Sequence, residues 1–411
     1  MRVSLAQHAT TEHDTAAGVT RFVILVPDGM ADEPIDALGG RTPMEAAATP
    51  CMDALAAAGE VGLVRTVPAG MPAGSDVANL SVLGYDPRAV YTGRAPLEAV
   101  SMGVKLGPGD IAYRCNFVTI ADGLMRDNTA GSMDSEAAAV LIAALRDRFA
   151  GSPFEFHPGV SYRHLMVWRD GMEAECTPPH DILDRPVGGY WPRDLDGEAH
   201  AAAELMRVME SAHEVLGGLR PGTDIWLWGQ GTAPRLPLLA EQRGLRGAVV
   251  AAVDLIRGIG VAAGMDVIEV PGATGDLETD YAAKGAAAVA ALGDHDLVLV
   301  HVEAPDEAGH QGDALAKVTA IERVDAEVLA PILAMPHPPA LLVLTDHPTP
   351  VRLRTHTDPP VPFVIATPAE SAEAAAPSAS AKPFTEAAAA AAGLLVGSGP
   401  ELMDRFLARA R

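Results

Sequence analysis

Short, uninterrupted apolar runs constrain the fold of this chain more than any other feature of its sequence. Three of them, at residues 22–26, 297–300 and 341–344, are followed closely by aspartate or histidine. Runs of this kind are typical of strands that are buried on both faces of a parallel sheet. In open α/β sheets, ligands bind beyond the carboxyl ends of the strands. The pattern therefore predicts an α/β sheet with polar side chains gathered at one edge.

The composition indicates an acidic globular protein. The 411 residues can bury a large core, and 48% hydrophobic against 20% charged residues is not the composition of a disordered chain. With 54 acidic and 30 basic residues, the formal net charge is −24. Such a chain repels nucleic acid and anionic membranes, so we expect neither as a partner. A small anionic substrate is compatible with this charge only if metals and a few arginines reverse the potential locally.

The cysteine pattern and the absence of long apolar segments predict a soluble, cytoplasmic protein. Cys51, Cys115 and Cys176 are odd in number and form no C-x-x-C pair, so we expect reduced, buried side chains. No apolar run approaches the length of a membrane-spanning helix. Residues 1–20 lack the apolar core of a signal peptide, and we expect them to form a flexible extension.

The alternation of strands and helices is interrupted in the middle of the chain. Residues 21–105 and 223–411 follow an α/β pattern, which includes a strand expected at residues 225–228. Residues 106–222 have the aromatic and β-branched content of a separate α+β unit. The sequence thus predicts a discontinuous parallel-sheet core with helices on both faces, interrupted by an inserted cap.

One group of candidate metal ligands follows the run at residues 297–300. Asp306 and His310 are four residues apart, which places both on one side of a helical turn. His356 can supply a third ligand from a separate loop. A lone residue of either type is more often a helix cap or a hydrogen-bonded structural residue.

A second group follows the other two runs. Asp346 and His347 are adjacent after residues 341–344, and Asp28 follows residues 22–26. The recurrence of aspartate and histidine behind three strands favours metal binding over the structural interpretation. Mixed Asp/His sites suit Mn²⁺ or Zn²⁺, whereas carboxylates alone suit Mg²⁺.

Two neighbouring metal ions suit phosphoryl transfer, because they bind both the attacking and the leaving oxygen. Ser75, in a Pro- and Gly-rich segment at residues 68–76, is the best candidate nucleophile, although its local sequence alone favours an ordinary turn serine in a flexible loop. The chain contains neither G-x-S-x-G nor G-x₄-G-K-[ST]. A His-activated serine hydrolase and a P-loop ATP site are therefore not expected.

Arginines can supply further contacts to an anionic substrate, and the candidates are Arg94, Arg163 and Arg257. A guanidinium group matches the geometry of phosphate and carboxylate. Each of the three, taken alone, is more often an ordinary surface or structural residue.

Eleven segments, spread from about Phe22 to the C-terminus, carry a specific family resemblance. They are PDGMAD (27–32), LGGRTP (38–43), GSDVAN (74–79), LGYDP (83–87), YTGR (91–94), RCN (114–116), PGVSYR (158–163), GATG (272–275), APDEAGH (304–310), TDH (345–347) and THT (355–357). Together they resemble the archaeal-type cofactor-independent (2,3-bisphosphoglycerate-independent) phosphoglycerate mutases of the alkaline phosphatase superfamily. WLWGQG (226–231) and TPPHD (177–181) are similar to a bacterial branch that is also proposed to be homoserine kinase-like.

The resemblance implies two divalent metal ions, most readily Mn²⁺ with Zn²⁺ or Mg²⁺ as alternatives, and a phosphoserine intermediate on Ser75. One ion would be held by Asp28, Ser75, Asp346 and His347, and the other by Asp306, His310 and His356. The substrate-binding residues that it implies are Arg94, Asn116, Arg163, His164 and Arg257. The insert at residues 106–222 would be a substrate-binding cap that keeps water from the phosphoserine.

The function favoured by these observations is the interconversion of 3-phosphoglycerate and 2-phosphoglycerate without bisphosphoglycerate. A second hypothesis is a transferase on the same scaffold with another acceptor, such as homoserine or an intermediate of phosphonate metabolism. A third is a phosphatase or phosphodiesterase, which needs only that water reach the phosphoserine. A non-catalytic binding protein is least favoured, because it should have lost at least one ligand position. The sequence does not fix the oligomeric state.

Overall fold

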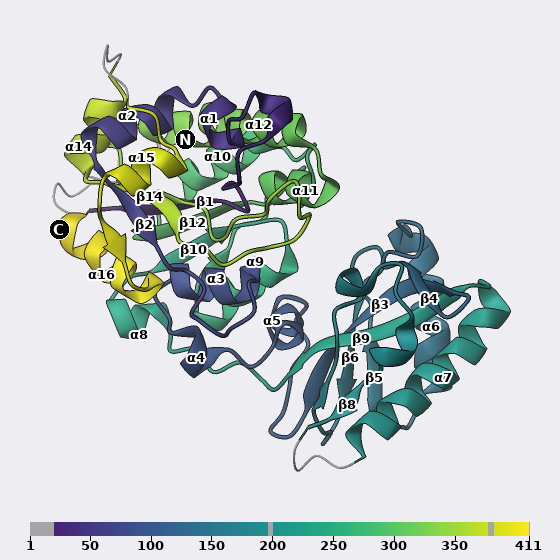
Figure 1. The fold of residues 1–411 in the computed structure, drawn as a ribbon. Helices are drawn as coiled ribbons and strands as arrows, with labels where there is room; N and C mark the ends of the chain where they lie inside the picture. The colour runs from purple at the N-terminus through teal and green to yellow at the C-terminus, as the bar shows by residue number, and fades with distance from the viewer. Residues whose placement is uncertain (1–19, 196–199, 377–381, 411) are drawn as a thin grey trace, which may run out of the picture.

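The chain forms two bodies of unequal size (Figure 1), and the computed structural model describes residues 20–195, 200–376 and 382–410. The larger body contains the N- and C-terminal parts of the chain, and the smaller body is formed from its middle. The predicted class, an α/β parallel-sheet core interrupted by an α+β unit, is confirmed. A flexible extension was expected at residues 1–20, and residues 1–19 of this range lie outside the described residues.

An eight-stranded sheet forms the centre of the larger body, in the order β11-β10-β12-β1-β13-β14-β2-β15. Its strands are β1 (Phe22–Pro27), β2 (Glu60–Val64), β10 (Gly247–Val250), β11 (Asp266–Val267), β12 (Leu297–Val302), β13 (Ala340–Leu344), β14 (Val361–Ala366) and β15 (Leu395–Val396). Only β14 runs antiparallel to its neighbours. The three runs singled out in the sequence are β1, β12 and β13, which lie side by side, so their carboxyl ends share one edge.

Each face of this sheet is covered by helices, and successive side chains of β1 point into opposite cores. Ile24 and Val26 pack into one hydrophobic cluster, whereas Val23 and Leu25 pack into the other. The first cluster includes residues of α3 (Ser75–Val82), α8 (Leu239–Arg243), α9 (Asp254–Ala262) and α16 (Gly399–Ala410). The second includes residues of α2 (Pro50–Ala58), α10 (Tyr281–Ala291), α12 (Ala314–Arg323) and α14 (Pro368–Ala374).

Shorter helical segments complete the larger body. They are η1 (Asp36–Leu38), α1 (Pro43–Ala46), α4 (Pro87–Val90), α11 (Ala304–Gln311), the π-helical η4 (Val324–Leu329), α13 (Ala330–Leu333) and α15 (Glu386–Ala391). Among the described residues, no helix is both long enough and apolar enough to cross a membrane.

The smaller body contains a five-stranded antiparallel sheet with two long helices packed against it (Figure 1). The strands are β3 (Ile111–Ala121), β4 (Leu124–Asp127), β5 (Phe154–His157), β6 (Arg163–Trp168) and β9 (Thr223–Gly231), and the helices are α6 (Ser135–Arg148) and α7 (Ala201–Leu219). Smaller elements are β7 (Ala174–Glu175), β8 (Arg193–Asp194), η2 (Pro179–Ile182) and η3 (Val187–Gly189).

The position of β9 differs from the expectation. The strand expected at residues 225–228 as part of the core sheet pairs instead with β3, antiparallel, in the smaller body. A short apolar run suits a buried strand in either sheet, so the run itself does not identify its partner. The smaller sheet therefore extends beyond residue 222.

Two segments connect the bodies, and they cross at a pair of glycines. The chain enters the smaller body through α5 (Arg94–Ser101) and leaves it at the end of β9. Gly93 has φ 134°, and a Cβ there would lie 1.9 Å from the carbonyl oxygen of Gln230. A Cβ at Gly231 would lie 1.7 Å from the carbonyl oxygen of Thr92. The backbones touch at this crossing, which only glycine permits.

Candidate metal centre

All seven ligands expected from the sequence lie at the shared carboxyl edge of β1, β12 and β13. Asp28 directly follows β1, Asp306 and His310 lie on α11 after β12, Asp346 and His347 follow β13, His356 lies in the loop before β14, and Ser75 is the first residue of α3. Parallel neighbours deliver these side chains to one place, because every βα connection of such a sheet opens on the same edge.

Asp306, His310 and His356 form the first group of ligand atoms. His310 Nε2 lies 3.2 Å from Asp306 Oδ2, and His356 Nε2 lies 3.4 Å from Asp306 Oδ1. The two Nε2 atoms are 2.9 Å apart. Ligands about 2.0–2.2 Å from one ion lie about 3–3.5 Å from one another, so this spacing fits three ligands of a single cation.

Asp28, Ser75, Asp346 and His347 form the second group, around the Nε2 atom of His347. That nitrogen lies 3.0 Å from Ser75 Oγ, 3.4 Å from Asp346 Oδ2 and 3.5 Å from Asp28 Oδ1. All four residues are buried. Two carboxylates buried side by side are unfavourable without a compensating positive charge, which a divalent cation would supply.

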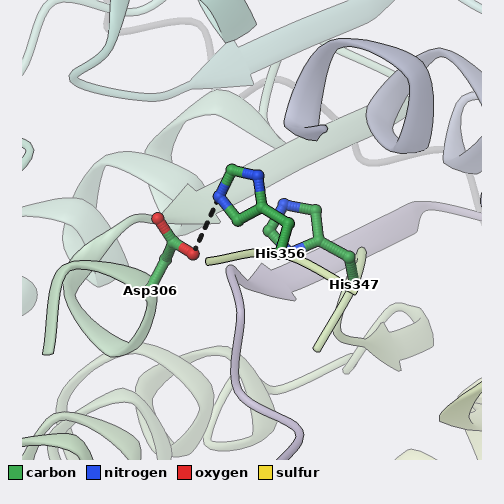
Figure 2. A group of neighbouring side chains, drawn as sticks. All are labelled: Asp306, His347 and His356. Atoms are coloured by element: carbon green, nitrogen blue, oxygen red, sulfur yellow. Dashed lines mark ion pairs between the residues drawn. The ribbon is translucent and has the colours of Figure 1, made fainter. Parts of the chain in front are cut away.

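The two groups adjoin each other. One ligand atom from each of Asp306, His347 and His356 lies within 4.8 Å of the other two. Figure 2 shows the His356 ring between Asp306 and His347. Two cations held by these groups would therefore be close enough to act on the same phosphoryl group.

Hydrogen bonds to Nδ1 leave Nε2 of the first-group histidines facing the site. His310 Nδ1 lies 3.0 Å from the carbonyl oxygen of Arg354, and His356 Nδ1 lies 3.1 Å from that of Ala73. A carbonyl only accepts, so each Nδ1 carries a proton and donates it. Metal-binding histidines are oriented in this way by the groups around them.

In the absence of a cation, protons take its place. Burial lowers the pKa of His310, but the neighbouring Asp306 raises it to about 9 overall. Burial raises the pKa of Asp28 well above its usual range, and the nearby Asp346 and Asp306 raise it further. Metal binding would displace these protons.

Two residues of the cluster, His301 and Glu303, were not predicted. His301, on β12, lies with Nε2 3.3 Å from Asp28 Oδ2 and Nδ1 3.6 Å from Glu303 Oε2. Burial lowers the pKa of His301 to about 4 and raises that of Glu303 to about 7. The available signal was a histidine inside an otherwise apolar strand. One ligand atom each of Asp28, His301 and Asp346 lie within 4.8 Å of one another, so His301 belongs to the cluster.

A group of arginines lies in α5 and the smaller sheet. Arg94 Nε donates to Glu98 Oε1 at 3.0 Å, and Arg114 Nε lies 2.9 Å from Glu98 Oε2. The guanidinium carbon of Arg114 is 4.3 Å from the ring centre of Trp228, and that of Arg94 is 5.6 Å from it. Trp228 Nε1 donates to Asn116 Oδ1 at 3.2 Å. The predicted residues Arg94 and Asn116 thus both adjoin one tryptophan.

His180 adjoins the arginine group. Its ring centre is 5.2 Å from that of the same tryptophan. Burial, then the charges of Arg94 and Arg114, and then those of His356 and His310 together lower the pKa of His180 to about 3. The charges of the arginine group and of two candidate metal ligands thus both act on His180.

Arg163 adjoins the arginine group. Its side chain is exposed, with the guanidinium carbon 5.3 Å from the ring centre of Tyr162. Burial raises the pKa of Glu98, but Arg114, Arg94 and Arg163 lower it below its usual value. The positive charge of Arg163 therefore acts on the same glutamate.

The other two predicted substrate-binding residues are placed differently. His164 is buried, its Nδ1 accepts from the backbone N–H of Gly159 at 3.0 Å, and burial lowers its pKa to about 4. Arg257, on α9, forms an ion pair with Glu269. Within the described parts of the chain, neither has a hydrogen bond or ion pair with the metal-site residues.

Comparisons with known proteins agree on one family. A family model described as 2,3-bisphosphoglycerate-independent phosphoglycerate mutase matches residues 56–219. A protein of that name from Methanosarcina barkeri is 49% identical over 370 residues, covering 86% of this chain and 93% of the relative. A "probable" one from Geobacter sulfurreducens is 48% identical over 408 residues, covering 95% and 100%. The solved structure of the cofactor-independent phosphoglycerate mutase from Thermoplasma acidophilum is similar, with a TM-score of 0.61, 26% identity and coverage of 95% and 100%.

Proposed function

This chain belongs to the family of 2,3-bisphosphoglycerate-independent phosphoglycerate mutases, and on that basis we propose that it interconverts 3-phosphoglycerate and 2-phosphoglycerate through a phosphoserine. The observation that carries this proposal is the convergence of Ser75 with two adjoining groups of Asp and His ligands at one sheet edge. Relatives about half identical over almost the whole chain bear the mutase name, so the kinase-like and hydrolase alternatives are not favoured.

The donor atoms fit two divalent cations. The first would be held by Asp306, His310 and His356, and the second by Asp28, Ser75, Asp346 and His347. Carboxylate, imidazole and hydroxyl donors together suit Mn²⁺ best, with Zn²⁺ or Mg²⁺ as alternatives. When bound, the ions would offset the charge of the phosphoryl oxygens and lower the pKa of the serine hydroxyl.

Ser75 is placed to take the phosphoryl group. It begins α3, and the first N–H groups of a helix lack a carbonyl partner within the helix and can bind phosphoryl oxygens. The N–H group of Val77 donates to Asp76 Oδ1 at 2.9 Å. In the first transfer, Ser75 Oγ bonds to phosphorus while the bond from phosphorus to the glycerate oxygen breaks. The glycerate then turns, its other hydroxyl attacks the same phosphorus, and Ser75 Oγ leaves. One glycerate oxygen gains a proton and the other loses one, so the exchange is balanced.

The arginine group would bind the end of the substrate that does not react. Arg94 and Arg114 share the single negative charge of Glu98, which leaves net positive charge for a carboxylate. Guanidinium groups bind carboxylates bidentately. Arg163 and Asn116 adjoin this group, whereas the part of His164 and Arg257 in substrate binding stays a prediction.

The two-body architecture suits this chemistry. We assign metal-dependent phosphoryl transfer to the larger body and the exclusion of water to the smaller body, which includes β9 as well as the insert expected at residues 106–222. Water that reached the phosphoserine would hydrolyse it. The expected partner is one small phosphorylated substrate, and the expected setting is the glycolytic reaction sequence in the cytoplasm.

The experiment follows 3-phosphoglycerate by phosphorus NMR with Mn²⁺-loaded protein, without bisphosphoglycerate or nucleotide. We expect conversion to 2-phosphoglycerate that a chelator stops and that Ser75→Ala abolishes. Ser81→Ala, on the same helix but bonded to the backbone N–H of Gly399, is the matched control and should retain activity. Inorganic phosphate as the main product would support a phosphatase, and a strict requirement for ATP would support a kinase.

A further inference from the structure

We propose that the hydroxyl group of Thr349 is a positioning group that couples the two metal sites, because it holds one ligand of each. This inference rests on the proposed function only in that both groups of ligands bind metal. It adds a residue that lies outside the seven ligands and contacts both groups.

The hydroxyl lies between the two ligand groups. Thr349 follows His347 by two residues and is fully buried. Its Oγ1 is 2.5 Å from Asp306 Oδ1, in the first group, and 3.3 Å from His347 Nδ1, in the second. One side chain therefore contacts a ligand from each site.

The chemistry of the partners fixes the direction of both hydrogen bonds. An ionised carboxylate only accepts, so the Thr349 hydroxyl donates to Asp306. Its oxygen is then free to accept from His347, which places the imidazole proton on Nδ1. His347 Nε2 keeps its lone pair and faces the carboxylates and the serine of the second site. A single hydroxyl proton thus sets both the orientation of Asp306 and the tautomer of His347.

The surroundings of Thr349 hold this hydroxyl in place. Its carbonyl oxygen accepts from Lys317 Nζ at 2.8 Å. A Cβ at Gly29 would lie 2.5 Å from Thr349 Oγ1, and one at Gly309 would lie 2.5 Å from the Thr349 carbonyl oxygen. Two glycines therefore leave the space that the threonine occupies, and larger residues would displace it.

Loss of the hydroxyl should weaken both sites. Without it, Asp306 Oδ1 lacks its donor and the carboxylate can rotate away from the first cation. His347 can then place its proton on Nε2, which would block the second. Because both effects act through one group, a cation at one site favours the conformation that binds the other, and this coupling is reciprocal.

The test is a Mn²⁺ titration of the metal-free full-length chain, with free Mn²⁺ followed by electron paramagnetic resonance. Thr349→Val keeps the shape and removes the hydroxyl, and Thr349→Ser keeps the hydroxyl. We expect Thr349→Val to lower the affinity of both sites by about 10–100-fold, the usual effect of losing an outer hydrogen bond to a ligand. Thr349→Ser should recover most of that loss, which a purely packing role would not predict.

Thr279→Val is the matched control. Thr279 is also buried, and its hydroxyl accepts from the backbone N–H of Thr274 at 2.9 Å. Among the described residues, no hydrogen bond joins this hydroxyl to a candidate metal ligand. Its Mn²⁺ affinities should equal those of the unaltered protein. If Thr349→Val does not fold, Thr349→Ala removes the same hydroxyl without adding bulk and answers the same question.

Two results would overturn the proposal: unchanged Mn²⁺ affinities in the Val or Ala variant, or a loss at only one site. Neither depends on catalysis, since no substrate is present. A protein that binds two Mn²⁺ ions but does not convert phosphoglycerate would contradict the proposed function and leave this coupling standing.

Discussion

At the scale of single residues, the metal centre gathers more negative charge than a protein interior tolerates. Ligand atoms of Asp28, Glu303 and Asp306 lie within 4.8 Å of one another, and Asp346 adjoins Asp28. Buried carboxylates at this spacing repel one another unless protons or cations intervene. A bound divalent cation would therefore stabilise this centre.

This charge predicts that Mn²⁺ stabilises the folded protein. A ligand present at one hundred times its dissociation constant adds about 2.7 kcal/mol per site to the free energy of unfolding. Urea unfolding in Mn²⁺ and in a chelator measures the difference. Asp306→Asn keeps the shape of a candidate ligand but removes its charge. Mn²⁺ should therefore raise the free energy of unfolding of this variant by less. An unfolding midpoint that is the same with and without metal would contradict the prediction.

Five candidate ligands could be named from the sequence because they follow apolar strands, namely Asp28, Asp306, His310, Asp346 and His347. Ser75 lies beside the other candidate ligands, but it is the buried first residue of α3 and does not lie in the flexible loop that its local sequence favours. His301 was missed because its place in the cluster depends on register. It pairs with Val26 on β1, two residues before Asp28, and no local pattern shows which strands are neighbours.

At the scale of elements, a buried ion pair joins α12 to the loops that carry the metal ligands. Lys317 Nζ lies 2.7 Å from Asp32 Oδ2, with 0% and 1% of the two side chains exposed. It also donates to the carbonyl oxygens of Ala31 and Thr349, at 3.2 and 2.8 Å. One ammonium group thus fixes the loop after β1 against the loop after β13.

Lys317→Met should therefore destabilise the protein strongly. Removing one partner of a buried pair leaves an uncompensated charge, here on Asp32. This lowers the free energy of unfolding by about 3–5 kcal/mol. Arg352→Ala is the control, because Arg352 pairs with Glu33 at 2.9 Å with 67% and 49% of the side chains exposed. An exposed pair contributes about 0–1 kcal/mol. If the midpoints of urea unfolding of the two variants shift equally, the buried ion pair is not required for stability.

The crossing between the bodies gives a prediction for Gly93→Ala. Its φ of 134° disfavours any side chain, and a Cβ would also overlap the Gln230 carbonyl oxygen. Gly103→Ala separates the two effects, because Gly103 has φ 69° but a Cβ there would contact nothing within 4 Å. The free energy of unfolding of Gly103→Ala should fall by about 1–2 kcal/mol, because alanine is strained in a left-handed backbone conformation. The free energy of unfolding of Gly93→Ala should fall by about 1–3 kcal/mol more, because its Cβ would overpack the crossing. Equal melting temperatures would contradict the close contact.

Elements with a strong local signal were easier to predict than their partners. The Ala-rich stretches at residues 135–149 and 281–292 favour helices by their composition, and they form α6 (Ser135–Arg148) and α10 (Tyr281–Ala291). The strand at residues 225–228 exists, but it was assigned to the wrong sheet. Its two tryptophans were a usable signal, since Trp226 packs against Trp191, 5.1 Å between ring centres, within the aromatic-rich smaller body.

At the scale of the whole molecule, the proposed substrate site draws on both bodies. Arg114 is a residue of β3, while the metal ligands belong to the larger body. Arg114→Met should raise KM for 3-phosphoglycerate by about 30-fold or more, the effect of about 2–5 kcal/mol from one charged contact. The affinity for Mn²⁺ should not change.

Arg126→Met is the matched control for this variant. Arg126 lies on β4 of the same sheet, but it pairs with the exposed Asp184. Its KM should equal that of the unaltered protein. A KM in Arg114→Met that also stays unchanged would remove Arg114 from the substrate site.

The overall architecture could be predicted because the insert interrupts a regular strand–helix alternation. The orientation of the arginine group could not be predicted from the sequence, because it depends on how α5 packs between α9 and the smaller sheet. Glu98 shows the difficulty: it is an unremarked glutamate in the sequence, yet it holds two arginines that come from α5 and β3.

The glycine crossing has a consequence for how such a protein can diverge. The chain leaves the core beside Gly93 and returns beside Gly231, so the intervening residues form a closed excursion from a single point. Such an insertion can be lengthened, shortened or replaced as a unit while the ends of the core strands stay in place. Natural selection can thus change the smaller body of this enzyme while the candidate metal ligands of the larger body stay in place.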